Sequence, residues 1–232
     1  MLVLLHEGLG SVAMWKEVPK QLARLTGCGV LTYSRYGNGF SEVLQEPRAV
    51  SYMHDEALET LPDVLDEFEV RSAVLVGQSD GASIALIYAG EIGARLCGVA
   101  VEAPHVFVED ISVQSIAQAK VAFESTDLPQ RLGRYHADVS RTFYGWNDIW
   151  LHPEFRSWNI RECVRKIRVP ILAIQGVDDE YGTMAQLDAI GQDARQARVD
   201  TLALAKCGHA PHRDRPDLAL PAIAAFVKSV TS

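Results

Sequence analysis

One serine of the sequence is flanked by two glycines and stands between an apolar run and a helix-forming run. Residues 73–76 are typical of a buried parallel strand, and residues 82–89 are typical of a helix. Gly77 and Gly81 have no Cβ, so the turn between strand and helix can be tight. Ser79, at the apex, would be held in a strained turn in front of a helix N-terminus, which is how a nucleophilic hydroxyl is presented.

A nucleophilic serine needs a general base and a carboxylate that orients this base. Of the seven histidines, His209 directly follows the last expected strand, at residues 200–205. Sites on parallel sheets collect at the carboxyl ends of strands, so His209 is the first candidate for the base. His212 is the second choice. We expect surface or packing roles for the other histidines, which are His6, His54, His105, His136 and His152.

The orienting carboxylate should follow the strand before that one, at residues 171–175. Asp178, Asp179 and Glu180 all lie directly after this strand, and residue type alone does not separate them. Glu102, at the end of an earlier strand, is a less favoured fourth choice.

The elements that must position these side chains alternate between strand and helix. We expect strands at 2–5, 30–33, 73–76, 98–102, 171–175 and 200–205, and helices at 14–25, 51–68, 82–90, 187–198 and 218–230. Pro62 should kink the second helix. This alternation predicts an α/β fold, a mostly parallel sheet with helices on both faces.

The interval 105–164 breaks the alternation, because it offers helical stretches and no clear strand. It also contains half of the aromatic residues of the chain, namely Phe107, Phe123, Tyr135, Phe143, Tyr144, Trp146, Trp150, Phe155 and Trp158. We therefore predict a helical cap at 105–164, inserted into a core formed by 1–104 and 165–232. Most of these aromatic side chains should pack the cap, and a few should line a pocket.

The composition is that of an ordinary globular protein, with 232 residues, 48% hydrophobic and 22% charged. A net charge of -8 without a cluster of Lys or Arg argues against nucleic-acid and membrane-surface partners. The four cysteines form no Cys-x-x-Cys pair, so we expect neither disulfides nor a zinc site, and no cofactor. The apolar start at 2–5 is too short for a signal sequence or a membrane span, which predicts a cytoplasmic protein.

The order Ser79, Asp179, His209 resembles the triad of the α/β-hydrolase superfamily. The run H-E-G-L-G-S from position 6 is similar to the H-G-x-x-G-S loop of that family, and G-Q-S-D-G from position 77 to its nucleophile elbow. G-V-D-D from position 176 resembles the family's G-x-x-D, which favours Asp179 over Asp178, and G-H from position 208 resembles its G-H. The similarity extends over nearly the whole chain and includes the position of the cap.

The resemblance implies a role for each of these residues. Ser79 would attack a carbonyl carbon, His209 would take and return the proton, and Asp179 would fix the imidazole tautomer. The backbone N–H groups of Asp80 and Gly8 would bind the oxyanion.

Three features depart from the family pattern. Glu7 stands where the family has glycine. A carboxylate beside an oxyanion hole disfavours negative charge there unless it turns away or is paired. The identity of the second oxyanion donor is therefore open between the N–H groups of Gly8 and Leu9. Arg35 lies one position earlier than the family's loop arginine and is a candidate partner for Glu7. The family's first two strands are absent, so strand 30–33 should lie at an exposed sheet edge. A homodimer paired through this edge is one predicted way to cover it.

Together, the triad pattern and the aromatic cap predict a serine hydrolase that cleaves a small to medium, apolar carboxylic ester through an acyl-enzyme. A serine nucleophile argues against the superfamily's dehalogenases and epoxide hydrolases, which use aspartate. Hydrolases of C–C bonds, lactones or amides and cofactor-free haloperoxidases use the same triad and stay as alternatives. A non-catalytic protein of the same fold that binds a small ligand is the alternative from outside the enzymes.

Overall fold

The computed structural model describes residues 1–231 and contains a six-stranded sheet in which all neighbouring strands are parallel. Its spatial order is β2-β1-β3-β4-β5-β6. The strands are β1 (Leu2–Leu5), β2 (Val30–Thr32), β3 (Ala73–Gln78), β4 (Leu96–Glu102), β5 (Ile171–Gly176) and β6 (Val199–Leu204). The expected α/β sheet is confirmed, including the place of β2 at its edge.

The central strands are apolar on both faces because helices cover both faces of the sheet. Every residue of β1, β3 and β5 is buried. Successive side chains point to opposite faces, so Leu75 packs into one hydrophobic cluster, whereas Val74 and Val76 pack into the other. This is the pattern of a parallel sheet buried on two sides.

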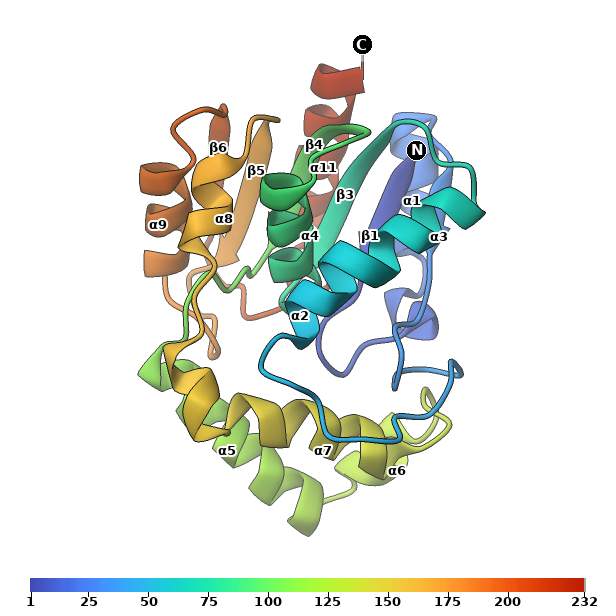
Figure 1. The fold of residues 1–232 in the computed structure, drawn as a ribbon, viewed down its shortest axis with the longest axis vertical. Helices are drawn as coiled ribbons and strands as arrows, with labels where there is room; N and C mark the ends of the chain where they lie inside the picture. Colours follow the sequence, from blue (N-terminus) through green and yellow to red (C-terminus); the bar gives the residue numbers. More distant parts are fainter. Residues whose placement is uncertain (232) are drawn as a thin grey trace.

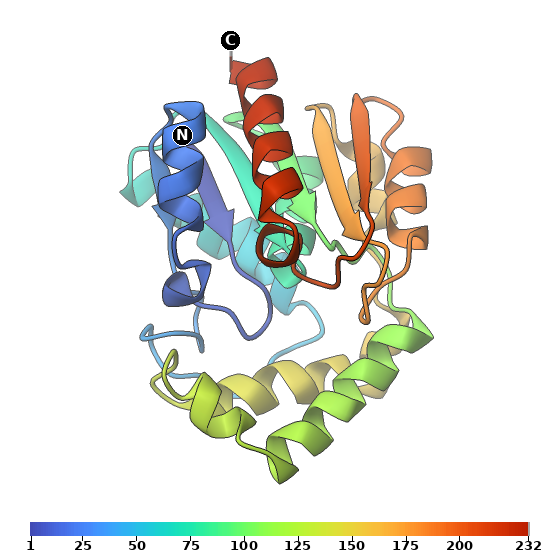
Figure 2. The ribbon, with the colours of Figure 1, turned by 180° about the vertical axis from the view of Figure 1, so that it is seen from behind.

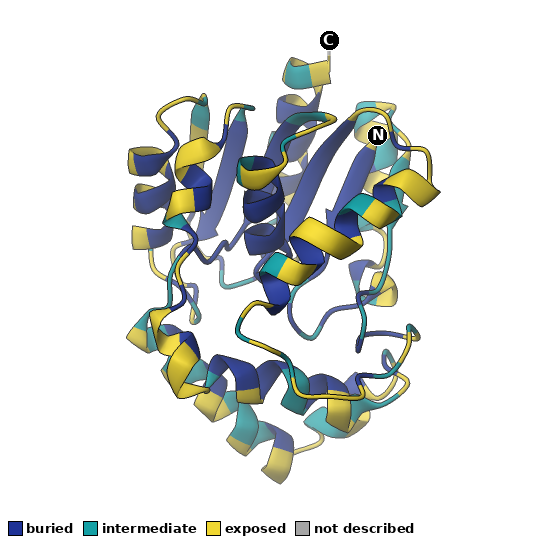
Figure 3. Cartoon of the chain, viewed as in Figure 1, coloured by how far each residue is buried: buried dark blue, intermediate teal, exposed yellow. Residues whose placement is uncertain are grey.

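The helices form a layer on each face of the sheet. One layer contains α1 (Val18–Thr26) and α11 (Pro216–Thr231), which are in front in Figure 2. The other contains α3 (Leu61–Glu67), α4 (Asp80–Glu91), α8 (Arg161–Lys166) and α9 (Ala185–Asp193), which are in front in Figure 1. Figure 3 shows buried strands at the centre and exposed residues on the outward faces of the helices around them.

Several helix bounds differ from the expected ones, and backbone conformation explains two of the differences. The predicted helix 14–25 is interrupted at Lys16, which has a φ of 49°, so a short 3-10 turn (Val12–Trp15) precedes α1. The predicted helix 51–68 is three pieces: α2 (Tyr52–Asp55), a π-helical segment (Glu56–Thr60) and α3. Pro62 lacks the N–H that an α-helix needs, and the wider π turns just before it accommodate this loss. Helix α9 ends at Asp193, before the expected end at 198.

The segment between β4 and α8 lies beyond the carboxyl ends of the strands (Figures 1 and 2). It consists of α5 (Asp110–Ser125), α6 (Leu128–Leu132), α7 (Val139–Trp150) and a 3-10 turn (Pro153–Ser157). A single β-bridge between Phe107 and Asn159 joins its two ends. Helix α8 packs against α4 and α9 on the face of the sheet, where the carbonyl of Cys163 fills the space that a Cβ at Gly90 would need.

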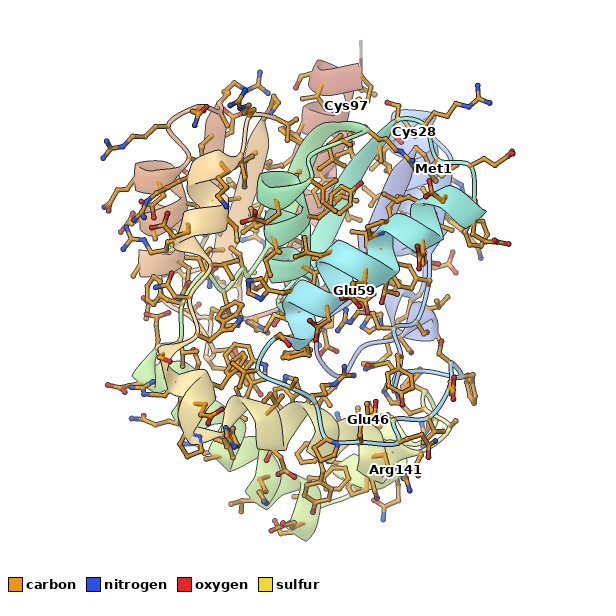
Figure 4. All side chains as sticks on the ribbon, in the orientation of Figure 1. Met1, Cys28, Glu46, Glu59, Cys97 and Arg141 are labelled. Atoms are coloured by element: carbon orange, nitrogen blue, oxygen red, sulfur yellow. The ribbon has the colours of Figure 1, made fainter. Side chains whose placement is uncertain are left out.

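The loop between β2 and α2 connects this helical segment to the sheet. Arg141 of α7 donates a hydrogen bond to the carbonyl of Leu44 at 2.7 Å, and Figure 4 shows Arg141 beneath the loop that carries Glu46. Cys28 and Cys97 lie at the opposite end of the molecule (Figure 4), and all four cysteines are free. No helix within residues 1–231 is apolar over a length that could cross a bilayer.

Candidate active site

Ser79 occupies a sharp turn between β3 and α4. Its φ of 53° and ψ of -119° lie outside the regions that non-glycine residues favour, so the turn is strained. Close backbone contacts maintain this turn. A Cβ at Gly77 would lie 2.3 Å from the carbonyl oxygen of Gly81, and a Cβ at Gly81 would lie 2.0 Å from that of Leu5. Both glycines are therefore required, as the sequence indicated.

The structure brings together the three residues that the sequence placed in the triad. Nε2 of His209 lies 2.9 Å from Oγ of Ser79, and Nδ1 lies 2.9 Å from both carboxylate oxygens of Asp179. With the Nδ1 proton donated to Asp179, Nε2 is left to accept the proton of the Ser79 hydroxyl. Asp179 follows β5 and His209 follows β6, so three strand ends converge on one point.

Asp179 is held as a buried anion. Its Oδ1 accepts hydrogen bonds from the Tyr181 N–H at 2.8 Å and the Gly182 N–H at 3.3 Å, and its Oδ2 accepts one from Gln175 at 2.6 Å. Burial alone would raise the pKa of Asp179, but the hydrogen bond and charge of His209 and the Tyr181 N–H lower it, and the pKa ends below its ordinary value. Asp178 and Glu180, the alternative acids, are exposed.

His212 and Glu102, the less favoured candidates for base and acid, form a pair with each other. Nδ1 of His212 lies 2.6 Å from Oε2 of Glu102, and the imidazole packs against Trp15 with ring centroids 4.9 Å apart. This pair does not include Ser79, so it is separate from the Ser79–His209–Asp179 set.

Two other histidines order the loops around the site. Nε2 of His6 accepts a hydrogen bond from the Arg35 N–H at 3.1 Å, and Nδ1 of His6 donates to the carbonyl of Glu7 at 2.7 Å. His136 accepts from the Gly39 N–H and donates to the carbonyl of Leu9. The sequence predicted surface or packing roles for these two histidines, and nothing in it marked the positions as links between loops.

His105 lies next to the proposed base. Its ring centroid is 5.6 Å from that of His209 and 5.0 Å from that of Trp150. Burial, followed by the charge of His209, lowers the pKa of His105 to about 3, so this imidazole is neutral at ordinary pH.

The loop after β1 supplies backbone N–H groups near Ser79. The Leu9 N–H donates to Oε2 of Glu7 at 2.6 Å, so it is engaged inside the loop. The N–H groups of Gly8 and of Asp80, the first residue of α4, make no hydrogen bond within residues 1–231. A Cβ at Gly8 would lie 3.1 Å from Oδ2 of Asp80 and 2.2 Å from Cδ1 of Trp146, which places Gly8 between the elbow and α7.

Arg35 fixes the shape of the same loop. Its buried guanidinium donates to the carbonyl oxygens of His6 and Glu7, the latter at 3.0 Å. The sequence suggested that Arg35 pairs with Glu7. The contact exists, but it is with the backbone carbonyl rather than with the carboxylate. Burial raises the pKa of the Glu7 carboxyl group, and the charge of Asp80 raises it further.

A cavity of about 760 Å³ opens beside Ser79 and His209. Its walls come from the loop after β1, from α5 to α7 and from the loops after β5 and β6. The apolar and aromatic lining includes Leu9, Ile116, Ala119, Leu132, Trp146 and Trp150, and the polar lining includes Glu7, His105 and Tyr181. Within residues 1–231, no three His, Cys, Asp or Glu side chains converge in a way that could hold a metal ion.

A family model matches most of the chain. The family model described as "Alpha/beta hydrolase family" matches residues 2–221. A partial match is to the proline iminopeptidase of Lactobacillus delbrueckii subsp. lactis, with 33% identity over 87 residues. This stretch is 38% of the present chain and 30% of that protein, so the chain matches less than a third of the length of that relative.

Solved structures of distant relatives share the fold. The 2-hydroxy-6-oxo-6-phenylhexa-2,4-dienoate hydrolase of Rhodococcus sp. strain RHA1 matches with a TM-score of 0.82 and 16% identity, covering 97% of this chain and 89% of that one. The monoacylglycerol lipase of Paleococcus ferrophilus matches with a TM-score of 0.72 and 16% identity, covering 99% and 94%. At such identities the likeness concerns the fold and not the substrate.

Proposed function

The chain belongs to the alpha/beta hydrolase family, and we propose that within it the chain is a serine hydrolase acting on a small to medium carboxylic ester. The observation that carries this proposal is the continuous contact from Ser79 through His209 to Asp179, with every heavy-atom distance at 2.9 Å. Such a set of contacts is what activates a serine hydroxyl for attack on a carbonyl carbon.

In the proposed mechanism, Oγ of Ser79 bonds to the ester carbonyl carbon while its proton passes to Nε2 of His209. The carbonyl oxygen becomes an oxyanion, and the N–H groups of Gly8 and Asp80 bind it. His209 then protonates the departing alcohol, which leaves an acyl group on Ser79. A water molecule that gives its proton to His209 attacks this acyl group, and release of the acid restores the serine. Asp179 stabilises the imidazolium in both steps.

We propose that the predicted cap, residues 105–164, covers the site with α5 to α7, and that residues 1–104 and 165–232 belong to the core. The proposed end of the cap moves to a position before α8, because α8 (Arg161–Lys166) packs against α4 and α9 on the sheet. The aromatic walls that α7 gives to the cavity support an apolar substrate portion, because such walls gain free energy by excluding water. Hydrolysis of a C–C bond, a lactone or an amide on the same triad is the alternative. The partial match to a proline iminopeptidase is the observation that favours an amide.

Labelling and substitution test the proposal together. A fluorophosphonate should label Ser79, and Ser79→Ala should lose both labelling and turnover, by about 10⁴-fold or more. His209→Gln should lose a similar factor. His212→Gln is the matched control, because His212 also pairs with a buried carboxylate, whereas the hydroxyl of Ser79 is hydrogen-bonded to His209, and it should keep turnover within a fewfold. Labelling at another residue, or an active Ser79→Ala protein, would contradict the proposal.

A panel of p-nitrophenyl esters, lactones, vinylogous diketones and aminoacyl amides identifies the bond that is cleaved. We expect the esters to give the highest kcat/KM. A higher kcat/KM for the diketones or amides, with Ser79 still labelled, would support the proposed triad but show that the substrate belongs to that class rather than to the esters.

A further inference from the structure

Glu7 presents a carboxylate oxygen to the cavity that contains Ser79. Its Oε2 accepts the Leu9 N–H at 2.6 Å. Its Oε1 has no hydrogen-bond partner within residues 1–231, and it is not among the polar atoms sealed away from solvent, so it contacts open space. Glu7 lines the cavity together with Ser79 and His209, and this cavity is therefore the space that Oε1 faces.

A second carboxylate lies behind the same wall. Asp80 is 1% exposed, and its Oδ2 accepts a hydrogen bond from the Tyr52 hydroxyl at 2.6 Å. Its Oδ1 is sealed from solvent and has no hydrogen-bond partner among residues 1–231.

The guanidinium of Arg35 donates to two backbone carbonyls rather than to either carboxylate, but its charge is close enough to oppose the rise in the pKa of Glu7 that burial causes. Arg48 is likewise close enough to Asp80 for that carboxylate to oppose the fall in the pKa of Arg48 that burial causes. The cavity is also lined by basic residues, namely Lys16, Arg131, Arg134 and Arg213. Glu7 and Asp80 therefore lie near cations but form no ion pair within residues 1–231, and Oε1 of Glu7 is left to pair with a cation that enters the cavity.

Aromatic rings lie beside the carboxylate of Glu7. The indole of Trp146 packs directly over Gly8, the residue after Glu7. Tyr181 and Trp150 line the same cavity, and the charge of Glu7 is among the causes that raise the pKa of Tyr181 to about 12. Aromatic rings together with a carboxylate are surroundings in which an ammonium group binds, through the ring quadrupole and through Coulomb attraction.

This arrangement makes hydrolysis of an uncharged ester slower than hydrolysis of an ester that carries a positive group. The tetrahedral intermediate carries a negative oxygen at the N–H groups of Gly8 and Asp80, and the side chains of Glu7 and Asp80 both repel that charge. A positive group on the substrate would cancel the repulsion and would also give Oε1 of Glu7 a partner.

We propose that the cavity selects substrates that carry a protonated amine near the cleaved carbonyl, with Glu7 as the group that binds the amine. The inference rests on the proposed serine hydrolase function and narrows its substrate class to aminoacyl esters or amides. Glu7 acts here as a specificity-determining residue that contacts the substrate.

Two methyl esters of nearly equal shape test this selection. Alanine methyl ester carries an ammonium group where methyl isobutyrate carries a methyl group. We expect the wild-type kcat/KM for the alanine ester to exceed that for the isobutyrate by at least tenfold. Glu7→Gln keeps the acceptor for the Leu9 N–H but removes the charge, and it should reduce this ratio at least tenfold, mainly through the alanine ester. Glu180→Gln, a change at another carboxylate that lines the cavity, should keep the ratio.

A second measurement needs no variant and so does not depend on the folding of Glu7→Gln. tert-Butylammonium should inhibit hydrolysis of methyl isobutyrate at a concentration at least tenfold below that of tert-butanol. A wild-type preference for the isobutyrate, an unchanged ratio in Glu7→Gln or equal inhibition by the two compounds would overturn the amine selection while Ser79 labelling persists. Failure of Ser79 to be labelled, with neither ester hydrolysed, would instead overturn the hydrolase function on which the inference rests.

Discussion

Substitution of Gly8 by alanine tests whether Trp146 of α7 packs tightly against the loop after β1. The added Cβ would lie 2.2 Å from Cδ1 and 2.3 Å from Nε1 of Trp146, whereas ordinary contact begins near 3.4 Å. The two groups must therefore separate by roughly 1.2 Å. Gly8 does not have the positive φ that makes alanine unfavourable, so backbone strain adds nothing to this clash.

The expected effect falls on catalysis more than on folding. Moving the Gly8 N–H by about 1 Å misplaces a proposed oxyanion donor, and such a displacement costs about 10²-fold in kcat, or about 2.7 kcal/mol of activation free energy. Overpacking should reduce the free energy of unfolding by about 1–3 kcal/mol. Ester turnover and urea unfolding measure the two effects separately.

A double-mutant cycle isolates the clash. In a Trp146→Ala background the indole is gone, so Gly8→Ala should cost less than about tenfold in kcat. Gly191→Ala is the matched control, because a Cβ there meets nothing within 4 Å, and it should leave kcat unchanged. An unchanged kcat in Gly8→Ala, or an equal loss in both backgrounds, would refute the reasoning.

Three further predictions follow from buried groups and from the sheet edge. The unfolded chain protonates His105 below about pH 6.5 whereas the folded chain keeps it neutral to about pH 3, so stability is lost as pH falls through this window, by up to about 1.4 kcal/mol per pH unit. His105→Gln should flatten that part of a plot of unfolding free energy against pH, and an unchanged slope would contradict the buried neutral state. Arg35→Met should leave the carbonyls of His6 and Glu7 without their donor and destabilise the fold by about 2–4 kcal/mol in urea unfolding, and a loss below 1 kcal/mol would show that the pairing is dispensable. If β2 pairs across its open edge, light scattering should give twice the monomer mass, and a monomer mass would exclude that dimer.

The parts of the fold that the sequence predicted are those encoded in short local patterns. The apolar runs of β1, β3 and β5 are buried on both faces, and such runs have few alternatives to a central parallel strand. The turn at Ser79 was predictable because close backbone contacts there allow only glycine at positions 77 and 81, and these two glycines are visible in the sequence.

Other features depend on tertiary contacts that local patterns do not contain. Spacing placed His212 and Glu102 near strand ends, but only the fold shows that they pair with each other. The carbonyls that Arg35 binds depend on how two loops meet, and the sequence suggested the Glu7 carboxylate instead. The break at Lys16 is a positive φ at a residue type that gives no signal for it.

The wide separation of Ser79 and His209 along the chain has a consequence for synthesis of the protein. The two residues are 130 positions apart, and His209 reaches Ser79 only after β6 has joined the sheet beside β5. A ribosome adds about 5–20 residues per second, so roughly 7 to 26 seconds pass between the emergence of Ser79 and that of its base. During this interval Ser79 lacks the side chain that we propose as its general base. Under the proposed mechanism, hydrolytic activity therefore begins only when the last third of the chain has folded. The rate at which activity recovers after denaturation then measures this final folding step rather than the formation of the first strands.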